Sequence, residues 1–174
     1  PVLYDYNNDG LLDLILGFDE FVTATSHRTG IRYYKNIGTV TMPAFELIDS
    51  DVATISQFNF TSPIYPSFGD MDGDGDYEIV IHMTGKGKDN SQGGFTDPPI
   101  FQCYTLEGSL LWSINLGKNI REGAHYSQFM VYDFDSDGKA EVAMKTADGS
   151  IDGKGTVIGD SSKDYRNEKG YILS

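Results

Sequence analysis

The stretch Asp70-Met71-Asp72-Gly73-Asp74-Gly75-Asp76-Tyr77-Glu78 decides the fold of this chain. Two other stretches align with it without gaps: Asp5-Tyr6-Asn7-Asn8-Asp9-Gly10-Leu11-Leu12-Asp13 and Asp133-Phe134-Asp135-Ser136-Asp137-Gly138-Lys139-Ala140-Glu141. Their common form is D-x-(D/N)-x-D-G-x-x-(D/E), and the offsets are 65 residues (5 to 70) and 63 residues (70 to 133). Each copy runs directly into an apolar segment. The chain is therefore built from repeats, each opened by an acidic turn that leads into a strand.

The acids of this motif predict a calcium loop. Ca²⁺ prefers six to eight oxygen ligands at about 2.3–2.6 Å, and glycine at the sixth position permits a sharp turn. An EF-hand would place its last acid at position 12, between two helices, whereas here it stands at the ninth position before a strand. With Ca²⁺ as the expected cofactor, the predicted ligands are Asp5, Asn7, Asp9 and Asp13, then Asp70, Asp72, Asp74 and Glu78, then Asp133, Asp135, Asp137 and Glu141.

The alternative to a calcium loop is an Asp-Gly hairpin turn that holds no metal. Three copies in register favour the cation, because carboxylates gathered without a counter-ion repel one another. The first copy has the weaker motif, since Asn7 takes the place of one carboxylate.

The segments between the motifs predict an all-β fold. Helical periodicity is absent, and a period of this length fits a small sheet of about four strands per repeat. We therefore expect β-propeller blades that form part of an incomplete propeller. The regions 85–99 and 149–169 show no strand pattern and are interpreted as long loops. The predicted strands are Leu12–Gly17, Ile31–Lys35, Phe45–Ile48, Ser67–Asp70, Glu78–Met83, Ile100–Thr105, Leu110–Asn115 and Phe129–Asp133.

Composition limits the partners. The chain has 26 acids against 13 bases, a net charge of −13, and 19 of the acids are Asp. This balance disfavours nucleic acid, whose phosphates require a basic surface, and no apolar run approaches the roughly 20 residues of a membrane span. Cys103 has no second cysteine to pair with and is expected to be a small buried hydrophobic residue.

Residues 1–62 resemble FG-GAP/VCBS repeats, most clearly in Tyr4–Leu14 and Gly30–Thr39. This resemblance implies a calcium-dependent propeller blade of a secreted or cell-surface protein. We accordingly divide the chain into a first unit, 1–62, and a second unit, 63–174.

Residues from about 67 to 174 resemble a narrower family. The distinctive runs are Lys88–Gly94, Asn115–Tyr126, Gln128–Asp133, Met144–Gly149 and Val157–Asp160. Together they are similar to the amino-terminal blades of a rhamnogalacturonan lyase of polysaccharide lyase family 11. The resemblance implies a secreted, calcium-containing propeller that cleaves rhamnogalacturonan I of pectin by β-elimination. On this interpretation the chain is a fragment of the lyase, and we expect it to be inactive alone.

β-Elimination from a uronic acid needs a base for the proton beside the carboxylate and a cation that neutralises that carboxylate. His125 and Lys145 are the candidate catalytic residues, although neither can be assigned from the sequence. A structural histidine and an ion pair of Lys145 with Asp148 or Asp152 are the competing interpretations.

Other polar groups are candidates for binding. Arg121 and Tyr126 are candidate substrate-binding residues; Arg121 and Glu122 could instead form a solvated surface pair, and Tyr126 could serve in packing. A further metal site could use Asp148, Asp152 and Asp160, whose spacing matches no standard loop. The chain as a whole could also be a non-catalytic module for adhesion or carbohydrate binding, or a join of two genes near residues 60–67.

Overall fold

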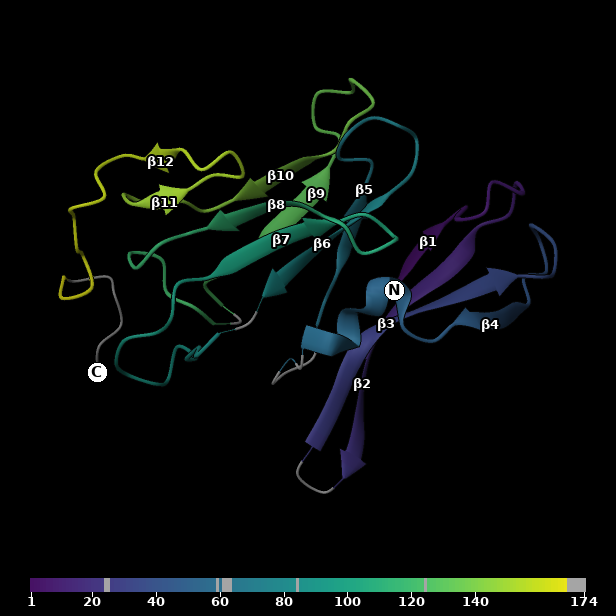
Figure 1. The fold of residues 1–174 in the computed structure, drawn as a ribbon, viewed down its shortest axis with the longest axis horizontal. Helices are drawn as coiled ribbons and strands as arrows, with labels where there is room; N and C mark the ends of the chain where they lie inside the picture. The colour runs from purple at the N-terminus through teal and green to yellow at the C-terminus, as the bar shows by residue number, and fades with distance from the viewer. Residues whose placement is uncertain (24–25, 59, 61–63, 84, 124, 169–174) are drawn as a thin grey trace.

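The computed structural model describes residues 1–23, 26–58, 60, 64–83, 85–123 and 125–168 (Figure 1). Strands dominate, and among these residues the one helix is the short 3-10 segment η1, Val52–Phe58. The all-β prediction is therefore confirmed. The strands are β1 Val2–Tyr4, β2 Asp13–Thr23, β3 Ser26–Asn36, β4 Phe45–Asp49, β5 Ser67–Gly69, β6 Glu78–Met83, β7 Ile100–Tyr104, β8 Leu110–Asn115, β9 Phe129–Tyr132, β10 Glu141–Met144, β11 Ser150–Ile151 and β12 Val157–Ile158.

These strands form three antiparallel sheets, and the third lies in the chain between β8 and β11 of the second. The first has the order β1-β2-β3-β4, the second β12-β11-β8-β7-β6-β5, and β9 pairs with β10 in the third. Every strand expected from the sequence overlaps an observed one. A closed propeller is not seen in the described part of the chain.

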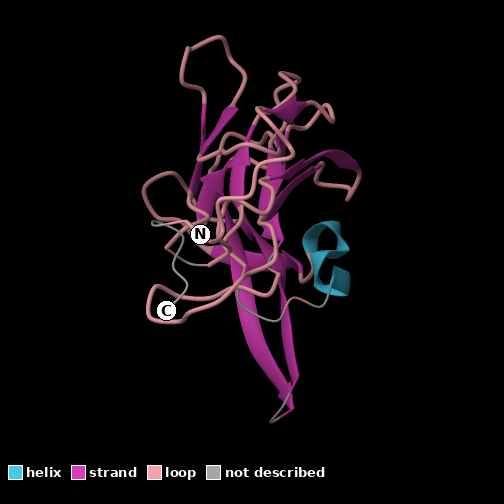
Figure 2. Cartoon of the chain, turned by 90° about the vertical axis from the view of Figure 1, so that its left-hand side faces the viewer, coloured by secondary structure: helices cyan, strands magenta, loops and turns pink. Residues whose placement is uncertain are grey.

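Two segments differ from the sequence expectation. β2 and β3 continue past the predicted ends into a long hairpin arm, which projects from the body in Figure 2. The Arg32 guanidinium lies 4.0 Å from the centre of the Phe18 ring and 2.8 Å from Glu20, so contacts across the arm stabilise it. The region 149–169, predicted as a loop, contains β11 and β12; Ile151 pairs with Asn115 and so extends the second sheet. Residue 169 lies outside the described residues.

The up-and-down order of the strands separates the connections into two groups. The three acidic turns join β1 to β2, β5 to β6 and β9 to β10, and they gather along the upper right of Figure 1. The connections 84–99 and 116–128 join β6 to β7 and β8 to β9, and therefore emerge from the opposite end of the sheets. The molecule thus has an acidic-turn end and a long-loop end.

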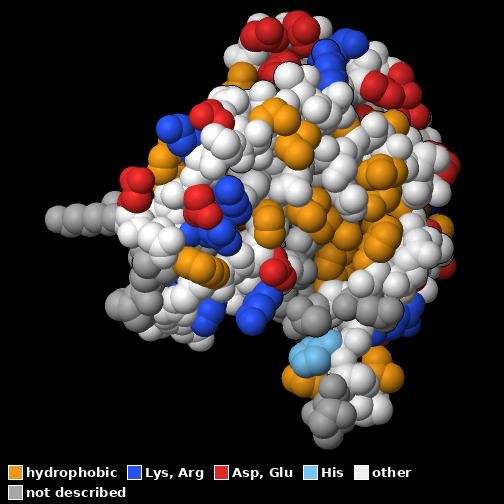
Figure 3. All heavy atoms as spheres, turned by 60° about the vertical axis from the view of Figure 1, so that its left-hand side comes forward, with side chains coloured by type: hydrophobic (Ala, Val, Ile, Leu, Met, Phe, Trp, Pro, Cys, Tyr) orange, Lys and Arg blue, Asp and Glu red, His pale blue; other side chains and the backbone are white. Residues whose placement is uncertain are grey.

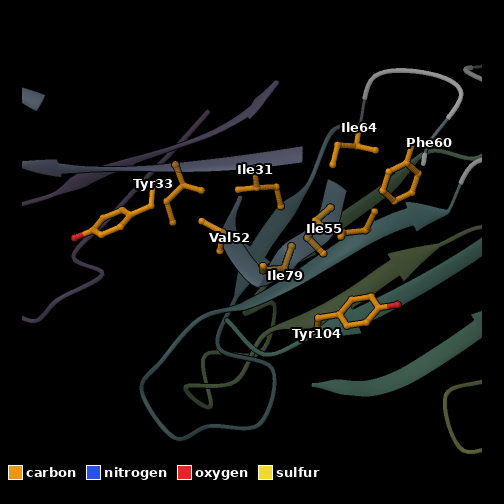
Figure 4. Close-up of a cluster of buried hydrophobic side chains, with 10 residues drawn as sticks. Ile31, Tyr33, Val52, Ile55, Phe60, Ile64, Ile79 and Tyr104 are labelled. Atoms are coloured by element: carbon orange, nitrogen blue, oxygen red, sulfur yellow. The ribbon is translucent and has the colours of Figure 1, made fainter. Parts of the chain in front are cut away.

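One apolar cluster joins the two units expected from the sequence. Ile15 and Ile31 of the first sheet and Ile55 of η1 pack with Ile79 and Tyr104 of the second sheet (Figure 4). β-Branched residues at alternate strand positions supply this cluster, as expected for a sheet with one face covered. The expected boundary at 62/63 falls outside the described residues. The cluster itself crosses that boundary, so residues on both sides share a core.

A second cluster, around Phe101, Leu116 and Ile120, anchors the base of the long-loop end. Cys103 is fully buried on β7, as expected, and burial raises the pKa of its thiol to about 12. Among the described residues, no helix has the length and apolar character needed to cross a membrane.

Candidate functional site

The acidic turns, called the first loop (5–13), second loop (70–78) and third loop (133–141), are placed identically in their sheets. In each, the acid at the ninth position begins the outgoing strand and pairs with the residue that precedes the acid at the first position. The pairs are Tyr4 with Asp13, Gly69 with Glu78, and Tyr132 with Glu141. Each loop is therefore closed at its base by the strand ladder.

The loops also share a backbone conformation. The fourth and sixth positions have positive φ in all three, and glycine at the sixth position adopts this region without strain. These residues are Asn8 (55°), Gly73 (83°), Ser136 (64°), Gly10 (86°), Gly75 (98°) and Gly138 (93°). The first-position carboxylate accepts the N–H of the sixth-position glycine in every loop, at 2.8–3.0 Å. The motif therefore produces the same turn conformation in all three loops.

The third loop brings its four acids together. One carboxylate oxygen from each of Asp133, Asp135, Asp137 and Glu141 lies within 4.8 Å of the others. Acidic side chains crowd the upper rim of the molecule in Figure 3. An all-oxygen, all-carboxylate donor set fits a hard divalent cation such as Ca²⁺.

The second loop gathers Asp70, Asp72 and Glu78 within the same limit. Glu78 is only 3% exposed, and this burial raises the pKa of its carboxyl group. The nearby carboxylates of Asp72, Asp74 and Asp70 raise the pKa further, whereas the hydrogen bond that Glu78 accepts from the Met71 N–H at 2.7 Å lowers it. Asp74 is not part of the group of three, and its carboxylate accepts the N–H of Asp76 at 2.9 Å. The salt bridges of the described residues do not include a carboxylate of this loop, although the Lys139 ammonium binds its Asp72 carbonyl.

The first loop is different. Among the described residues, its acids do not form a group of this kind. Asp13 is fully buried and accepts hydrogen bonds from the Asn36 N–H (2.7 Å), the Tyr33 hydroxyl (3.0 Å) and the Asn7 amide (3.1 Å). Asp9 forms an ion pair with Lys35 at 3.0 Å. Of the predicted ligand sets, the structure thus assembles those of the second and third loops, apart from Asp74, but not that of the first.

Neighbouring loops are tied to each other. The ring of Tyr4 stacks on that of Tyr77 at 3.9 Å, and the Tyr4 hydroxyl donates to Gly75 O. The Lys139 ammonium donates to Asp72 O at 2.7 Å, and Ala140 N donates to Asp70 O at 2.6 Å. The acidic-turn end therefore forms one connected rim.

At the long-loop end, Arg121 and Glu122 are 4% and 3% exposed, so their interpretation as a solvated surface pair is wrong. The Arg121 guanidinium donates to the carbonyls of Gly94 (2.7 Å) and Gln92, and Glu122 O accepts the N–H of Lys88. These bonds hold the loop 85–99 against the connection 116–128. Burial of the Arg121 charge is possible because carbonyls of that loop receive it, and the buried Glu122 carboxylate accepts the Ser127 hydroxyl at 3.5 Å.

A histidine that the sequence did not single out completes this arrangement. His82 Nε2 lies 2.8 Å from the Glu122 carboxylate, and the imidazole stacks on Phe101 at 4.7 Å. The spacing of 40 residues between His82 and Glu122 gives no local signal for this pair.

The catalytic candidates lie at the same end. His125 is exposed, and its Nδ1 lies 2.5 Å from Asp89 in the loop 85–99; the N–H of Asn90 and His125 both lower the pKa of Asp89. Lys145 follows β10 and is exposed. The salt bridges of the described residues do not include the expected pair of Lys145 with Asp148 or Asp152.

The structure treats the candidate substrate-binding residue Tyr126 and the three acids of the expected further metal site differently. Tyr126 lies beside Arg121, whose guanidinium is 5.4 Å from the Tyr126 ring centre. The buried Tyr126 hydroxyl has no hydrogen-bond partner within the part of the chain that the structure describes. The three acids of the proposed further metal site are each used in local bonds instead. Asp148 accepts from the Tyr165 hydroxyl, Asp152 from the Thr156 N–H and Asp160 from Ser162, and these bonds lower the three pKa values. They do not form a metal-ligand group among the described residues.

Antiparallel sheets with recurring acidic loops define a β-repeat protein, and the FG-GAP-like repeat model matches residues 5–81, which hold the first and second loops. The family model "Rhamnogalacturonan lyase family 11, C-terminal domain" matches residues 50–174, which is most of the chain. The chain therefore belongs to rhamnogalacturonan lyase family 11.

Two Bacillus subtilis (strain 168) proteins are similar to the chain. The rhamnogalacturonan endolyase YesW is 62% identical over 109 residues, and the rhamnogalacturonan exolyase YesX is 59% identical over 109 residues. In each case the match covers 62% of this chain and 18% of the relative, so the chain spans about a fifth of these proteins.

Solved structures extend the similarity to the first sheet. The chain matches the Bacillus licheniformis rhamnogalacturonan lyase PL11 with a TM-score of 0.59 and 40% identity, over 90% of this chain and 29% of that one. The exolyase YesX gives the same TM-score and 38% identity, over 88% and 28%. At least 88% of the chain is aligned in each case, so the aligned residues include most of residues 1–62 as well as the second unit.

Proposed function

We propose that this chain is part of a rhamnogalacturonan lyase that cleaves the rhamnose–galacturonate bond of rhamnogalacturonan I by β-elimination. The observation that carries the proposal is the family match over residues 50–174, together with 62% identity to a rhamnogalacturonan endolyase. The substrate is a polymer of the plant cell wall and meets the enzyme outside the cell. We therefore propose a secreted or cell-surface protein with pectic polysaccharide as its partner.

The three sheets are proposed to be successive blades of a β-propeller. Each contains an antiparallel hairpin around an acidic loop, and these hairpins follow one another along the chain as β1-β2, β5-β6 and β9-β10. The structural match to the solved lyases supports this arrangement.

Ca²⁺ is proposed to bind the second and third loops. The gathered carboxylates of Asp70, Asp72 and Glu78, and those of Asp133, Asp135, Asp137 and Glu141, support this assignment. There the cation would neutralise the crowded acids and fix the rim that joins adjacent sheets. Because the long loops emerge at the opposite end of the sheets, we assign this calcium a structural role rather than the calcium-assisted chemistry expected from the sequence.

The long-loop end is the proposed substrate-facing end. When the Nδ1 proton of His125 is donated to Asp89, Nε2 presents a lone pair that can accept the proton beside a uronate carboxylate. Lys145, an exposed cation, is proposed to neutralise that carboxylate. Arg121 acts indirectly, because its guanidinium is engaged in holding the loop that carries Asp89.

The experiment uses the complete gene product, incubated with rhamnogalacturonan I, and follows the ultraviolet absorbance of the unsaturated uronate that β-elimination creates. A rise is expected. His125→Gln should lower kcat by about 10²–10⁴-fold, the range typical of a lost general base, whereas the control His27→Gln, at the exposed hairpin arm, should not. A variant His125→Gln with unchanged kcat would remove this residue from the mechanism.

A non-catalytic binding module is the second candidate, and the FG-GAP-like match over residues 5–81 favours it. The same assay separates the two functions. Absence of the absorbance rise from a folded protein that still retains rhamnogalacturonan I on a column would establish the binding module.

A further inference from the structure

We propose that the first loop takes no cation, and that the ammonium of Lys35 is its built-in counter-ion. The first sheet would then fold independently of calcium, although its loop carries the same motif as the others. The proposal concerns the cation sites of the proposed function and does not depend on the lyase step.

The side chain at the third position does not fit a cation. In the first loop this residue is Asn7, and its amide nitrogen donates to both Asp13 Oδ2 and the Tyr33 hydroxyl, at 3.1 Å each. In the other loops this position supplies a carboxylate, Asp72 or Asp135, to the gathered acids that suit a hard cation. The first loop lacks that carboxylate, and its Asn7 side chain is held by the bonds to Asp13 and Tyr33.

The ninth position is already satisfied. The Asp13 carboxylate is fully buried and accepts three hydrogen bonds, from Asn36 N to Oδ1 and from Tyr33 and Asn7 to Oδ2. Turning it toward a cation would leave these buried donors without a partner, which is costly. The equivalent Glu78 accepts the Met71 N–H and is surrounded by like charge instead.

The acid at the fifth position, Asp9, is the one that pairs with the counter-ion. Lys35 Nζ lies 3.0 Å from Asp9 Oδ2, and this contact is the main cause that lowers the pKa of Asp9. Lys35 is only partly exposed and extends from β3, so the ammonium is delivered by the sheet itself.

The strand register shows that this cation is particular to the first sheet. Tyr34, which precedes Lys35, pairs with Leu14, the residue after the first loop. In the second sheet the residue after the loop, Ile79, pairs with Tyr104, so Thr105 stands where Lys35 stands. The first loop has three acids (Asp5, Asp9, Asp13) and a lysine that pairs with the Asp9 carboxylate. The second has five acids and a neutral threonine at the equivalent strand position, and the Lys139 ammonium that reaches it binds the Asp72 carbonyl rather than a carboxylate.

The first test compares one substitution at three equivalent positions of the complete gene product. Asp5→Asn, Asp70→Asn and Asp133→Asn each replace the first-position carboxylate while keeping one oxygen that accepts the loop N–H groups. Bound calcium is counted by equilibrium dialysis against Ca²⁺ alone. We expect Asp70→Asn and Asp133→Asn each to lose one ion and Asp5→Asn to lose none. Loss of one ion in Asp5→Asn would overturn the proposal.

The second test addresses Lys35 directly. Hydrogen exchange of residues 5–13 is measured in Lys35→Met, with exposed Lys154→Met as the matched control. Exchange in the first loop should be faster in Lys35→Met, in calcium and in chelator alike, and unchanged in Lys154→Met. Unchanged exchange in Lys35→Met, or slower exchange in the parent protein on addition of calcium, would contradict the counter-ion role. If all three loops are insensitive to calcium, the calcium part of the proposed function fails while the Lys35 proposal stands.

Discussion

The first and second loops have the same backbone and compensate their charge in opposite ways. In both, glycine at the sixth position adopts positive φ and donates its N–H to the first-position aspartate. Around the first loop, Lys35 lowers the pKa of Asp9, whereas in the second, burial and neighbouring carboxylates raise the pKa of Glu78. The protein pairs a carboxylate of the first loop with an ammonium, whereas at the second loop the ammonium of Lys139 binds a backbone carbonyl.

This difference teaches that the motif determines the conformation of the turn, whereas the residues around the turn determine whether its acids gather as cation ligands. Hydrogen bonds within the loop are similar in all copies, because they use the backbone and the first-position carboxylate. The decisive groups, Lys35, Tyr33 and Asn36, come from β3, about 20 residues or more beyond the loop. A search by motif alone counts three sites where the structure assembles two ligand groups in the described residues.

Removal of calcium is expected to have the largest effect on this comparison. At free calcium 100 times the dissociation constant, each occupied site adds about 2.7 kcal/mol to the free energy of unfolding. Excess chelator should therefore lower Tm strongly, and hydrogen exchange should accelerate in residues 70–78 and 133–141 but not in 5–13. An identical melting curve with and without chelator would show that calcium does not stabilise the fold.

Alanine at the third position tests the loops one at a time. Asp72→Ala and Asp135→Ala should each lower the calcium stoichiometry by one, with a loss of about 2.7 kcal/mol at the same calcium excess. The matched variant Asn7→Ala should keep the full stoichiometry, because its loop holds no ion. Calcium counting and chemical denaturation measure the two effects. Full stoichiometry in both aspartate variants would refute the ligand assignment.

Removal of one hydroxyl group probes the buried network of the first loop. Tyr33→Phe deletes a donor to the buried Asp13 carboxylate and should lower the free energy of unfolding by about 1–3 kcal/mol. The loss should be equal in calcium and in chelator, as measured by urea denaturation. Tyr132→Phe, at an exposed tyrosine, is the control and should change little. A loss that appears only with calcium would link the first loop to the cation.

The smallest effect is on pH dependence in calcium-free protein. The folded-state pKa of Glu78 is raised, so its charge destabilises the fold at neutral pH, and this penalty is relieved as pH falls through the raised value. The folded-state pKa of Asp9 is lowered, so its contribution is present above the unfolded value and is lost as pH falls through the lowered one. Carboxyl NMR titration should therefore give a higher pKa for Glu78 than for Asp9, and calcium should lower only that of Glu78. A calcium-dependent shift at Asp9 would remove the contrast.

Much of the fold could be predicted from the sequence because its signals are local. Runs rich in β-branched residues next to Asp-Gly turns placed most strands of the first two sheets and β9 of the third, as in Glu78–Met83 after the second loop. The continuation of β2 and β3 into the hairpin arm was missed, since contacts such as Arg32 on Phe18 join residues that no short pattern relates. Strands β11 and β12, of two residues each, are too short to show alternation.

The candidate site at the long-loop end was only partly accessible to such reasoning. Arg121, His125 and Tyr126 were identified as candidates, but the burial of Arg121 and Glu122 and their bonds to the loop 85–99 depend on chain segments about 30 residues apart. His82 was missed because its partner Glu122 lies 40 residues away.

The sequence by itself determined the repeat, the acidic turns, the β-rich architecture and the resemblance to rhamnogalacturonan lyases, since each is written in residues close together along the chain. Only the tertiary structure decided which turns gather ligands and which is closed by the protein's own groups. The physical reason is that the electrostatic field in a loop is the sum over all charges near it in space. At the first loop the ammonium of Lys35, from a neighbouring strand, pairs with the Asp9 carboxylate, whereas at the second loop the ammonium of Lys139 binds the Asp72 carbonyl instead.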